Sequence, residues 1–318
     1  MITRLAILLT ALVLLAVPVR AQTILSNDGG DAYQILTVQV LLARQGFSSG
    51  LMDNHSGART RGALADFMAA RGLASEEAAL TALKADARPL MGGYTLQPRD
   101  IAALGRAPKD WEEASREPSM AFESMPELLC ETFCMSERFL QQMNPGIDWG
   151  TVTAGVQVAV INWQPPPAVC NPARVEIDPN DFRLRLYGTN NNLLASFPCS
   201  VARDRTRIPA GELKMTVFAP NPDYTFNPAN YPESARARAI GHSLLLPAGP
   251  SNPVGVYWIG LSKAGFGIHG TPHPETIGSM ESHGCFRLMN RDVMTLSRFV
   301  RDGMPVRIHH PAAPAATP

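Results

Sequence analysis

The chain has 318 residues, of which 45% are hydrophobic and 18% are charged, a composition typical of folded globular proteins. At roughly 100–200 residues per domain, this length predicts two or three domains. Lys plus Arg and Asp plus Glu are 28 each, so the formal net charge is zero with His neutral. This balance argues against nucleic-acid binding and against docking on an acidic membrane surface, because both usually need a basic face. The 27 prolines and 25 glycines predict many turns and argue against an all-helical bundle.

Residues 1–21 have the pattern of a secretory signal peptide. A short positive start is followed by an apolar run over residues 5–19, and Val19 and Ala21 put small residues where a signal peptidase reads them. This run is shorter than the about 20 residues that a membrane-spanning helix needs, so we expect cleavage after Ala21 rather than a retained anchor. The mature chain is then exported and has no stable membrane span.

Export changes the interpretation of the five cysteines, because structural thiols pair in an oxidising compartment. An odd number leaves one thiol over, and four paired thiols allow three connectivities that the sequence does not distinguish. Cys130 and Cys134 are spaced for one helical face, where a bridge would carry some strain. Our hypothesis is that this pair and a Cys170–Cys199 pair would leave Cys285 free.

Residues 33–73 are predicted to form two short helices around a Gly-rich turn, with Gly46 and Gly72 as natural stops. Asp53, Asn54 and His55 have the residue types of a metal site, but a turn that caps the second helix explains them better. The stretch resembles the peptidoglycan-binding domain family, a small three-helix fold. A helical hairpin that binds no ligand and acts as a spacer is the alternative. The matching residues are Gln39, Leu42, Gly46, Phe47, Gly50, Asp53, Gly57, Thr60, Ala63, Phe67, Gly72 and Leu73.

Residues 74–119 are predicted to form a helix followed by a linker, and residues 120–163 form another small unit. This unit has an apolar helical run that ends near Asn144, followed by a short strand. Leu140, Asn144-Pro145, Gly155 and the strand at 156–161 resemble a LysM module. That resemblance implies a βααβ module, two helices on a two-stranded sheet, that binds N-acetylglucosamine polymers; an inert spacer is the alternative. A stiff Pro-rich linker follows at 164–167.

Residues 168–310 change character and predict a β-rich domain large enough for its own core. Apolar and polar residues alternate between turn signals, one helix is expected from Asn290 to Gly303, and a last strand follows. Residues 219–234 carry four prolines and predict a long loop over this domain. The tail at 311–318 is low in complexity and is expected to be disordered. The whole chain is therefore predicted to be a multidomain α+β protein.

The reactive residues lie between Ile268 and Asn290, where 23 residues hold three His, one Cys and one Arg. A thiol with a pKa near ~8.5 is a weak nucleophile until a neighbouring imidazole helps to remove its proton, so a nucleophilic Cys285 would need His269 or His283 in reach. Gly284 lets a substrate approach the local backbone N–H groups, which can stabilise an oxyanion. Arg287 lies on the same side as Cys285 in an extended chain and can bind a carboxylate with two hydrogen bonds.

Two other interpretations of these residues are weaker. A structural role for Cys285 is disfavoured because Ser, His, Gly and Arg give it a poorly apolar environment. Zinc suits the residue types His269, His273, His283 and Cys285. However, a Cys and a His separated by one Gly are awkwardly placed to bind the same ion, so we expect no metal.

This stretch closely resembles the L,D-transpeptidase catalytic domain, often called the YkuD family. The family pattern is a His-Gly pair, a gap of about a dozen residues, and Ser/Thr-His-Gly-Cys followed by Arg or Asn. Here the residues are His269-Gly270, then Ser282-His283-Gly284-Cys285, and Arg287. The resemblance covers roughly residues 173–308 and includes Asn252–Gly255, Ile277-Gly278 and Leu288–Asn290. Ile208 replaces the usual Thr before Pro209, and the loop at 219–234 is unusually long.

The resemblance implies a role for each matching residue. Cys285 would attack the bond between the L-centre and D-Ala in a peptidoglycan tetrapeptide stem and form a thioacyl-enzyme. His269 would be the general base, oriented by the carbonyl of Gly270. His283 and the N–H groups of Gly284 and Cys285 would shape the oxyanion site. Arg287, with Ser282 beside the nucleophile, would contact the substrate.

The resemblance also implies peptidoglycan peptide and glycan as partners and requires no cofactor. An amine of a second stem would give a 3→3 crosslink, and a lipoprotein Lys would give an anchored protein. Attack by water would instead make the chain a carboxypeptidase or an amidase. A non-catalytic wall-binding protein is a further alternative, which the intact motif around Cys285 disfavours. The expected location is the periplasm or another exported, wall-associated site.

Overall fold

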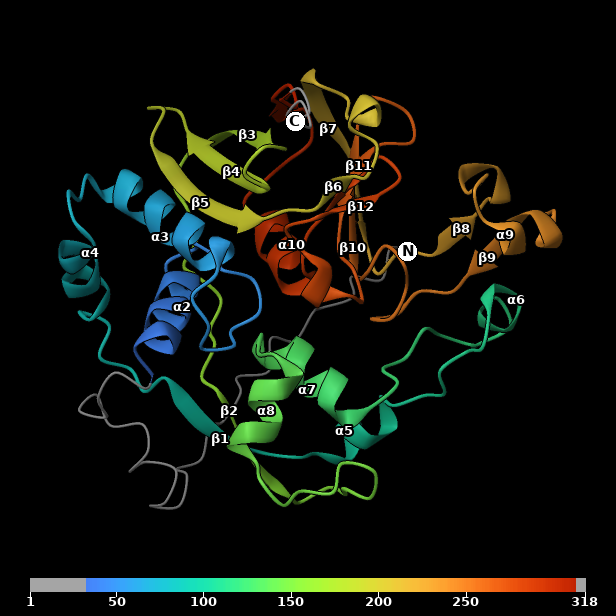
Figure 1. Ribbon diagram of the computed structural model, residues 1–318, viewed down its shortest axis with the longest axis horizontal. Helices are drawn as coiled ribbons and strands as arrows, with labels where there is room; N and C mark the ends of the chain where they lie inside the picture. The colour runs from blue at the N-terminus through green and yellow to red at the C-terminus, as the bar shows by residue number, and fades with distance from the viewer. Residues whose placement is uncertain (1–32, 313–318) are drawn as a thin grey trace, which may run out of the picture.

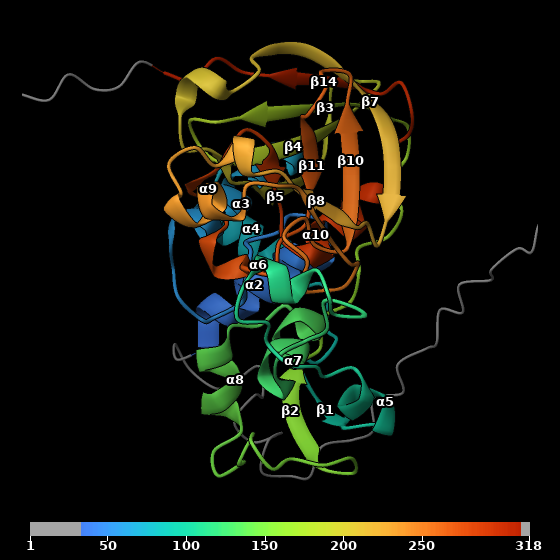
Figure 2. The same ribbon diagram turned by 90° about the vertical axis from the view of Figure 1, so that its right-hand side faces the viewer.

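The computed structural model describes residues 33–312 and places an N-terminal lobe beside a β-rich C-terminal domain (Figures 1 and 2). The predicted β-rich fold of the C-terminal part is therefore confirmed, and helices predominate in the N-terminal part. The predicted signal peptide at 1–21 and residues 313–318 of the predicted tail lie outside the described range. Between Tyr33 and Ala312, we find no helix that is both long enough and apolar enough to cross a bilayer.

The N-terminal lobe begins with three helices, α2 (Gln34–Arg44), α3 (Ala58–Arg71) and α4 (Glu76–Leu83). α3 ends at Gly72, which adopts a left-handed φ of 63°, and the Leu73 N–H donates to the Met68 carbonyl. α4 packs against both other helices, so the helical unit extends past residue 73. The Asp53–His55 turn caps α2 rather than α3, because Asn54 Oδ1 accepts a hydrogen bond from the Leu36 N–H.

A two-stranded sheet with helices forms the second part of the lobe. β1 (Met91–Thr95) pairs antiparallel with β2 (Gln157–Ile161), with Tyr94 opposite Val158. Asn144 joins the helices to this sheet, since its amide bonds the Leu140 carbonyl and both backbone groups of Ala159. The helices between the strands are α5 (Pro98–Ala102), α6 (Trp111–Ala114), α7 (Met125–Phe133) and α8 (Glu137–Met143).

The predicted linker at 74–119 is therefore wrong in part, because this stretch contains α4, β1, α5 and α6. The predicted unit at 120–163 starts too late, since its closing strand pairs with β1. β1 escapes a periodicity analysis because Gly92 and Gly93 interrupt the five residues of Met91–Thr95. The partner strand, which stabilises β1, lies far away in the sequence.

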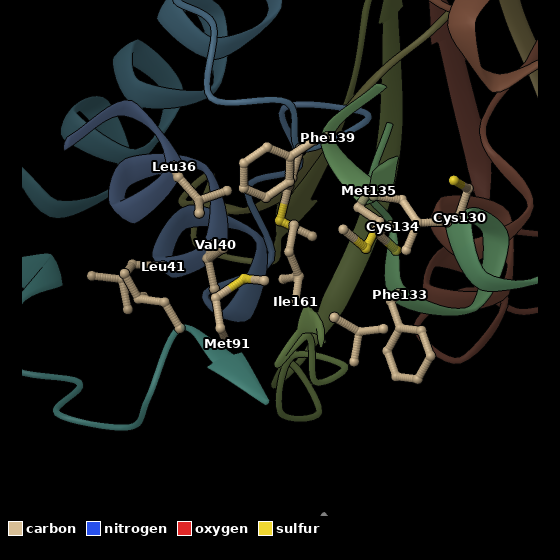
Figure 3. Packing of buried hydrophobic residues seen from close by; sticks show 14 of the residues in the cluster. Leu36, Val40, Leu41, Met91, Cys130, Phe133, Cys134, Met135, Phe139 and Ile161 are labelled. Atoms are coloured by element: carbon tan, nitrogen blue, oxygen red, sulfur yellow. The ribbon is translucent and has the colours of Figure 1, made fainter. Parts of the chain in front are cut away.

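Both parts of the lobe share a hydrophobic core, which Figure 3 shows in close-up. Leu36 and Val40 of α2 are fully buried in the same cluster as Ile161 of β2. Phe139 of α8 and Phe133 of α7 complete it. The three helices and the two-stranded unit are therefore packed into one body.

The C-terminal domain is built on a mixed sheet, and α10 (Asn290–Ser297) packs against its strand β10. Among the described residues, eight strands form this sheet in the order β13-β11-β10-β7-β14-β3-β4-β5. β6 (Val201–Ala202) pairs with β12 (Met280–Ser282) beside the sheet. The strands of the sheet are β3 (Pro172–Asp178), β4 (Arg183–Gly188), β5 (Leu193–Pro198), β7 (Gly211–Pro220), β10 (Tyr257–Leu261), β11 (Gly267–His269), β13 (Phe286–Arg287) and β14 (Pro305–Ile308).

The Pro-rich stretch at 219–234 is more ordered than the predicted loop. β8 (Tyr224–Phe226) within it pairs antiparallel with β9 (Leu244–Leu246), and α9 (Ala235–Ile240) lies between the two strands. We call residues 221–248 the lid. The lid acquires regular structure because β8 finds its partner beyond the Pro-rich segment.

The lobe covers the edge strand β5 of the sheet. The Ser48 N–H donates to the Ser196 carbonyl at 2.8 Å, and the Ser196 N–H donates to the Gly46 carbonyl at 3.0 Å. These bonds satisfy backbone groups that an edge strand would otherwise expose. One end of the sheet is thereby closed by the lobe, while the other end carries β11 and β13.

A buried charge network crosses the same interface. Asp66 of α3 bonds Arg183 Nε and Arg185 Nε of β4, each at 2.8 Å. The Arg183 side chain is 3% exposed and also donates to the Ser48 carbonyl and to the Ser196 hydroxyl. Burial lowers the pKa of Arg183, while Asp66 favours its charged form.

We expect Asp66→Asn to lower the free energy of unfolding by about 3–5 kcal/mol, because it leaves a buried guanidinium without a counter-charge. Urea unfolding followed by circular dichroism measures this loss. Asp181→Asn is the matched control, since Asp181 pairs with Arg185 at a site where Asp181 is 43% exposed. Asp181→Asn should lower the free energy of unfolding by less than about 1 kcal/mol. Equal losses in the two variants would show that Asp66 does not stabilise the interface.

Candidate active site around Cys285

The local strand pairing brings Cys285, His269 and Arg287 to one face of the sheet. β11 and β13 pair in parallel, with Ile268 opposite Phe286 and His269 opposite Arg287. Side chains alternate along a strand, and Ile268 and Phe286 are fully buried in the domain core. His269, Arg287 and the preceding Cys285 therefore point the other way, as the sequence analysis expected for Arg287.

These residues line a cavity of about 770 Å³. Ser282, His283 and Gly284 line it too, whereas Gly270 lies behind His269. The cavity also has walls that the sequence analysis missed. They are Trp258 of β10, Tyr224 and Tyr231 of the lid, and residues 108–111 beside α6.

His269 has a defined tautomer. Its Nδ1 lies 2.6 Å from the Gly270 carbonyl oxygen, which can only accept a hydrogen bond, so Nδ1 carries the proton. Nε2 is then left as a proton acceptor. The Trp258 ring stacks on the imidazole at 5.4 Å and 18°. Burial lowers the pKa of His269 to about 4, which keeps the ring neutral at pH 7.

A tightly packed junction holds the Gly270 carbonyl in place. A Cβ at Gly270 would lie 2.0 Å from Asn290 Oδ1, and a Cβ at Gly255 would meet the same atom at 2.0 Å. Gly255 also has a φ of +63°. Asn290 Oδ1 accepts a hydrogen bond from the Val256 N–H at 3.1 Å. The segments around Gly255 and Asn290 are the upstream and downstream pieces of the sequence resemblance, and both meet at Gly270.

Cys285 is a neutral thiol in this structure. Burial raises the pKa of Cys285 to about 11, and a hydrogen bond with the Gly267 backbone acts in the opposite direction. Sγ lies 3.5 Å from the Gly265 carbonyl, to which it donates. The sequence analysis expected a neighbouring imidazole to help to remove the thiol proton, which an imidazolium would do by lowering the thiol pKa. The structure shows the opposite shift, because burial dominates and a neutral His269 supplies no positive charge.

Ser282 and Gly284 shape the turn that presents Cys285. Ser282 Oγ donates to the Cys285 carbonyl at 2.5 Å and accepts from the Gly284 N–H at 3.2 Å. A Cβ at Gly284 would lie 3.2 Å from the Phe266 ring. The Ser282 hydroxyl is therefore engaged within the turn, and its contact with substrate stays a prediction.

His283 contacts the lid. Its Nε2 lies 2.8 Å from Glu233 Oε1, and its ring meets Tyr231 edge-on at 4.5 Å. This hydrogen bond lowers the pKa of Glu233. The Tyr231 and Tyr224 hydroxyls lie 2.6 Å apart. In the sequence, only the unusual length of the Pro-rich stretch pointed to a functional loop here. The sequence did not indicate which side chains of the loop reach the cavity.

Arg287 keeps part of its hydrogen-bonding capacity unused. Its Nη2 donates to Thr276 Oγ1 at 3.0 Å, and its buried Nε has no hydrogen-bond partner within residues 33–312. Burial lowers its pKa. The Arg287 guanidinium lines the cavity, where it can donate hydrogen bonds to an anionic or carbonyl group of a ligand.

All five cysteines are unpaired in the structure, so the hypothesised disulfides are not formed there. Cys170 is exposed, while Cys199 is fully buried. Cys134 ends α7 in a left-handed conformation with a φ of 55°. In the part of the chain that the structure describes, no group of three or more His, Cys, Asp or Glu residues could hold a metal ion.

Comparisons with known proteins concern the same region. A family model described as the YkuD L,D-transpeptidase catalytic domain matches residues 172–308. The putative L,D-transpeptidase YkuD of Bacillus licheniformis is 31% identical over 182 residues, covering 57% of this chain and 92% of that protein. The putative L,D-transpeptidase YkuD of Bacillus subtilis is 31% identical over 177 residues, which cover 56% of this chain and 88% of that protein. The NMR structure of the E. faecium L,D-transpeptidase catalytic domain matches 44% of this chain and 98% of that chain, at 18% identity and a TM-score of 0.33.

The burial of Cys285 and His269 predicts an unusual alkylation profile. Modification of Cys285 by iodoacetamide should rise with pH toward a midpoint near 11, because the thiolate is the reacting form. N-acetylcysteine, with a midpoint near ~8.5, is the reference. Peptide mapping by mass spectrometry follows Cys285 separately from the other cysteines.

His269→Ala should leave this midpoint almost unchanged, since a neutral imidazole does not stabilise the thiolate by charge. A wild-type midpoint below ~7 that rises in His269→Ala would instead show a preformed thiolate–imidazolium pair. That result would contradict the neutral pair described above.

Proposed function

The chain belongs to the YkuD-type L,D-transpeptidase family, and on that premise we propose that it forms a thioacyl-enzyme through Cys285 with peptidoglycan stem peptides. The observation that carries the proposal is the placement of Cys285 and His269 in one cavity, with the His269 tautomer fixed by the Gly270 carbonyl. Such an arrangement gives a nucleophile and a proton acceptor whose free nitrogen is Nε2.

In the proposed reaction, Cys285 Sγ attacks the carbonyl carbon of the bond between the L-centre and D-Ala of a tetrapeptide. His269 Nε2 takes the thiol proton as the Sγ–C bond forms, and the resulting imidazolium gives that proton to the leaving D-Ala amine. The C–N bond breaks, and the tripeptide remains attached to Cys285 as a thioester. Because Cys285 and His269 are both neutral at rest, proton transfer and attack are coupled.

We assign oxyanion stabilisation to the backbone N–H groups of Gly284 and Cys285, with His283 at the edge of the site. The Gly284 N–H bonds Ser282 Oγ in this structure, so it would exchange that partner for the oxyanion. Arg287 would bind a substrate carboxylate or carbonyl through its guanidinium, which lines the cavity. No step of this reaction uses a metal or an organic cofactor.

The acceptor decides the product. An amine of a neighbouring stem would give a 3→3 crosslink, and a Lys of a lipoprotein would give a wall-anchored protein. Water would release the tripeptide and make the chain an L,D-carboxypeptidase. We propose the transferase, acting outside the cytoplasm at the cell wall, because the curated relatives above are named L,D-transpeptidases.

We also propose that the N-terminal lobe binds the cell wall. The peptidoglycan-binding pattern lies on α2, α3 and the turns beside them, and the second part of the lobe begins and ends on paired strands, as a LysM module does, with four helices between them. Co-sedimentation of full-length Cys285→Ala protein with purified sacculi tests this proposal, because the variant binds without forming a covalent bond. Recovery in the supernatant at every sacculus concentration would favour a spacer role.

The acyl-transfer proposal predicts an intact-mass adduct on the mature protein incubated with a disaccharide-tetrapeptide. The added mass should equal that of the donor minus D-Ala, and Cys285→Ala should show none, because the nucleophile is absent. His269→Ala should fold normally and acylate at least about 100-fold more slowly, the usual contribution of a general base.

Product analysis separates the possible activities. Crosslinked dimers identify a transferase, and free tripeptides identify a hydrolase. A folded protein with a free Cys285 thiol, no adduct and no turnover would contradict the proposal. Near-normal activity of His269→Ala would move the general-base role to His283.

A further inference from the structure

One wall of the catalytic cavity comes from the N-terminal lobe. Residues 105–122, which we call the α6 loop, are inserted between α5 and α7 in the second part of the lobe. The Gly105 N–H donates to the Phe122 carbonyl at 2.8 Å and closes the base of the loop. From there the loop extends away from α5 and α7, and Figure 1 shows α6 beside β9 and α9 of the lid.

Aromatic rings connect the α6 loop to the catalytic motif. Trp111 stacks on Phe226 of the lid at 5.0 Å and 16°, and Phe226 stacks on Tyr231 at 5.3 Å and 25°. Tyr231 then meets His283 edge-on at 4.5 Å. His283 is two residues from Cys285, so Trp111 is linked to the nucleophile turn through two lid residues.

Polar contacts hold the α6 loop against the same region. Asp110 forms an ion pair with Arg236 of α9 at 2.9 Å. The Met120 N–H donates to the Ala248 carbonyl at 3.0 Å, and the Met120 carbonyl accepts from the Ser251 N–H at 3.1 Å. A Cβ at Gly249 would lie 2.2 Å from the Met120 carbonyl oxygen, so this close approach requires glycine.

The lid depends on the α6 loop for its hydrophobic core. Phe226, Ala237 and Leu246 of the lid are almost fully buried, and they form a cluster with Ala114 and Met120 that is separate from the main cores. Three buried lid side chains are too few to stabilise a folded unit without these partners. Removing Trp111 should therefore increase the population in which the lid is undocked.

We propose that Trp111 is a positioning residue for the acyl-transfer site. By docking the lid, it fixes Tyr231 against His283 and completes the wall that the substrate peptide meets. Lys109, Trp111 and Met120 line the same cavity as Cys285 and His269. The N-terminal lobe thus contributes directly to substrate binding, an inference that depends on the proposed function for the identity of the substrate.

The test compares Trp111→Ala with wild type in the full-length chain. Loss of one stacked aromatic pair should raise the KM for the disaccharide-tetrapeptide roughly five- to tenfold and change kcat less than about twofold. Trp111→Phe should restore KM to within about twofold of wild type. Trp149→Ala is the matched control, because Trp149 packs against the core of the lobe away from the cavity.

Hydrogen exchange of residues 224–246 gives a second readout that needs no turnover. Trp111→Ala should exchange these amides roughly five- to tenfold faster, whereas Trp149→Ala should match wild type. Unchanged lid exchange in Trp111→Ala, or an equal change in Trp149→Ala, would overturn the inference. A wild-type protein that no stem peptide acylates would refute the proposed function, while the exchange data would still decide whether Trp111 docks the lid.

Discussion

The hydrogen bond between His269 Nδ1 and the Gly270 carbonyl is the constraint on which the site depends. It fixes the tautomer, and the tautomer decides which nitrogen can take a proton from Cys285. The carbonyl itself is held where Gly255, Gly270 and Asn290 meet without room for a further side-chain atom. Segments far apart in sequence are therefore needed to orient one imidazole. This explains why the pieces outside the Cys motif belong to the same resemblance.

Burial sets the electrostatics of this pair. It raises the pKa of Cys285 and lowers the pKa of His269, so both residues are neutral between about pH 4 and 11. A neutral thiol is protected from adventitious alkylation and oxidation, which follow the thiolate. Because both groups start neutral, charge must develop during the attack on the carbonyl, and the local backbone N–H groups can stabilise the oxyanion that forms. The site thus favours a substrate that aligns with these donors over a small electrophile that does not.

The sequence analysis singled out residues that the structure brings together in one cavity, because most of them are close in the chain. An extended chain places Cys285 and Arg287 on one side, and the parallel pairing of β11 with β13 brings His269 to that side. It did not reveal β1, whose short Gly-containing strand is defined by a distant partner. It also missed Trp258, Tyr231 and Trp111, since an aromatic residue in a loop carries no local signal for the cavity it will line. The sequence also did not indicate that the helices and strands of the lobe share one core, because long-range packing creates that core.

The lobe contacts the catalytic domain at several separated places, and this changes what wall binding could do. At the sheet edge, the Asp66–Arg183 network and the Ser48–Ser196 bonds attach α3 and its preceding loop to β4 and β5. At the cavity, Trp111 and Asp110 attach the α6 loop to the lid. Separated attachments resist rotation of one body against the other far better than one flexible linker would. A glycan held by the lobe would then be presented to Cys285 in a fixed orientation, with the lid as the more mobile partner because its small core is shared.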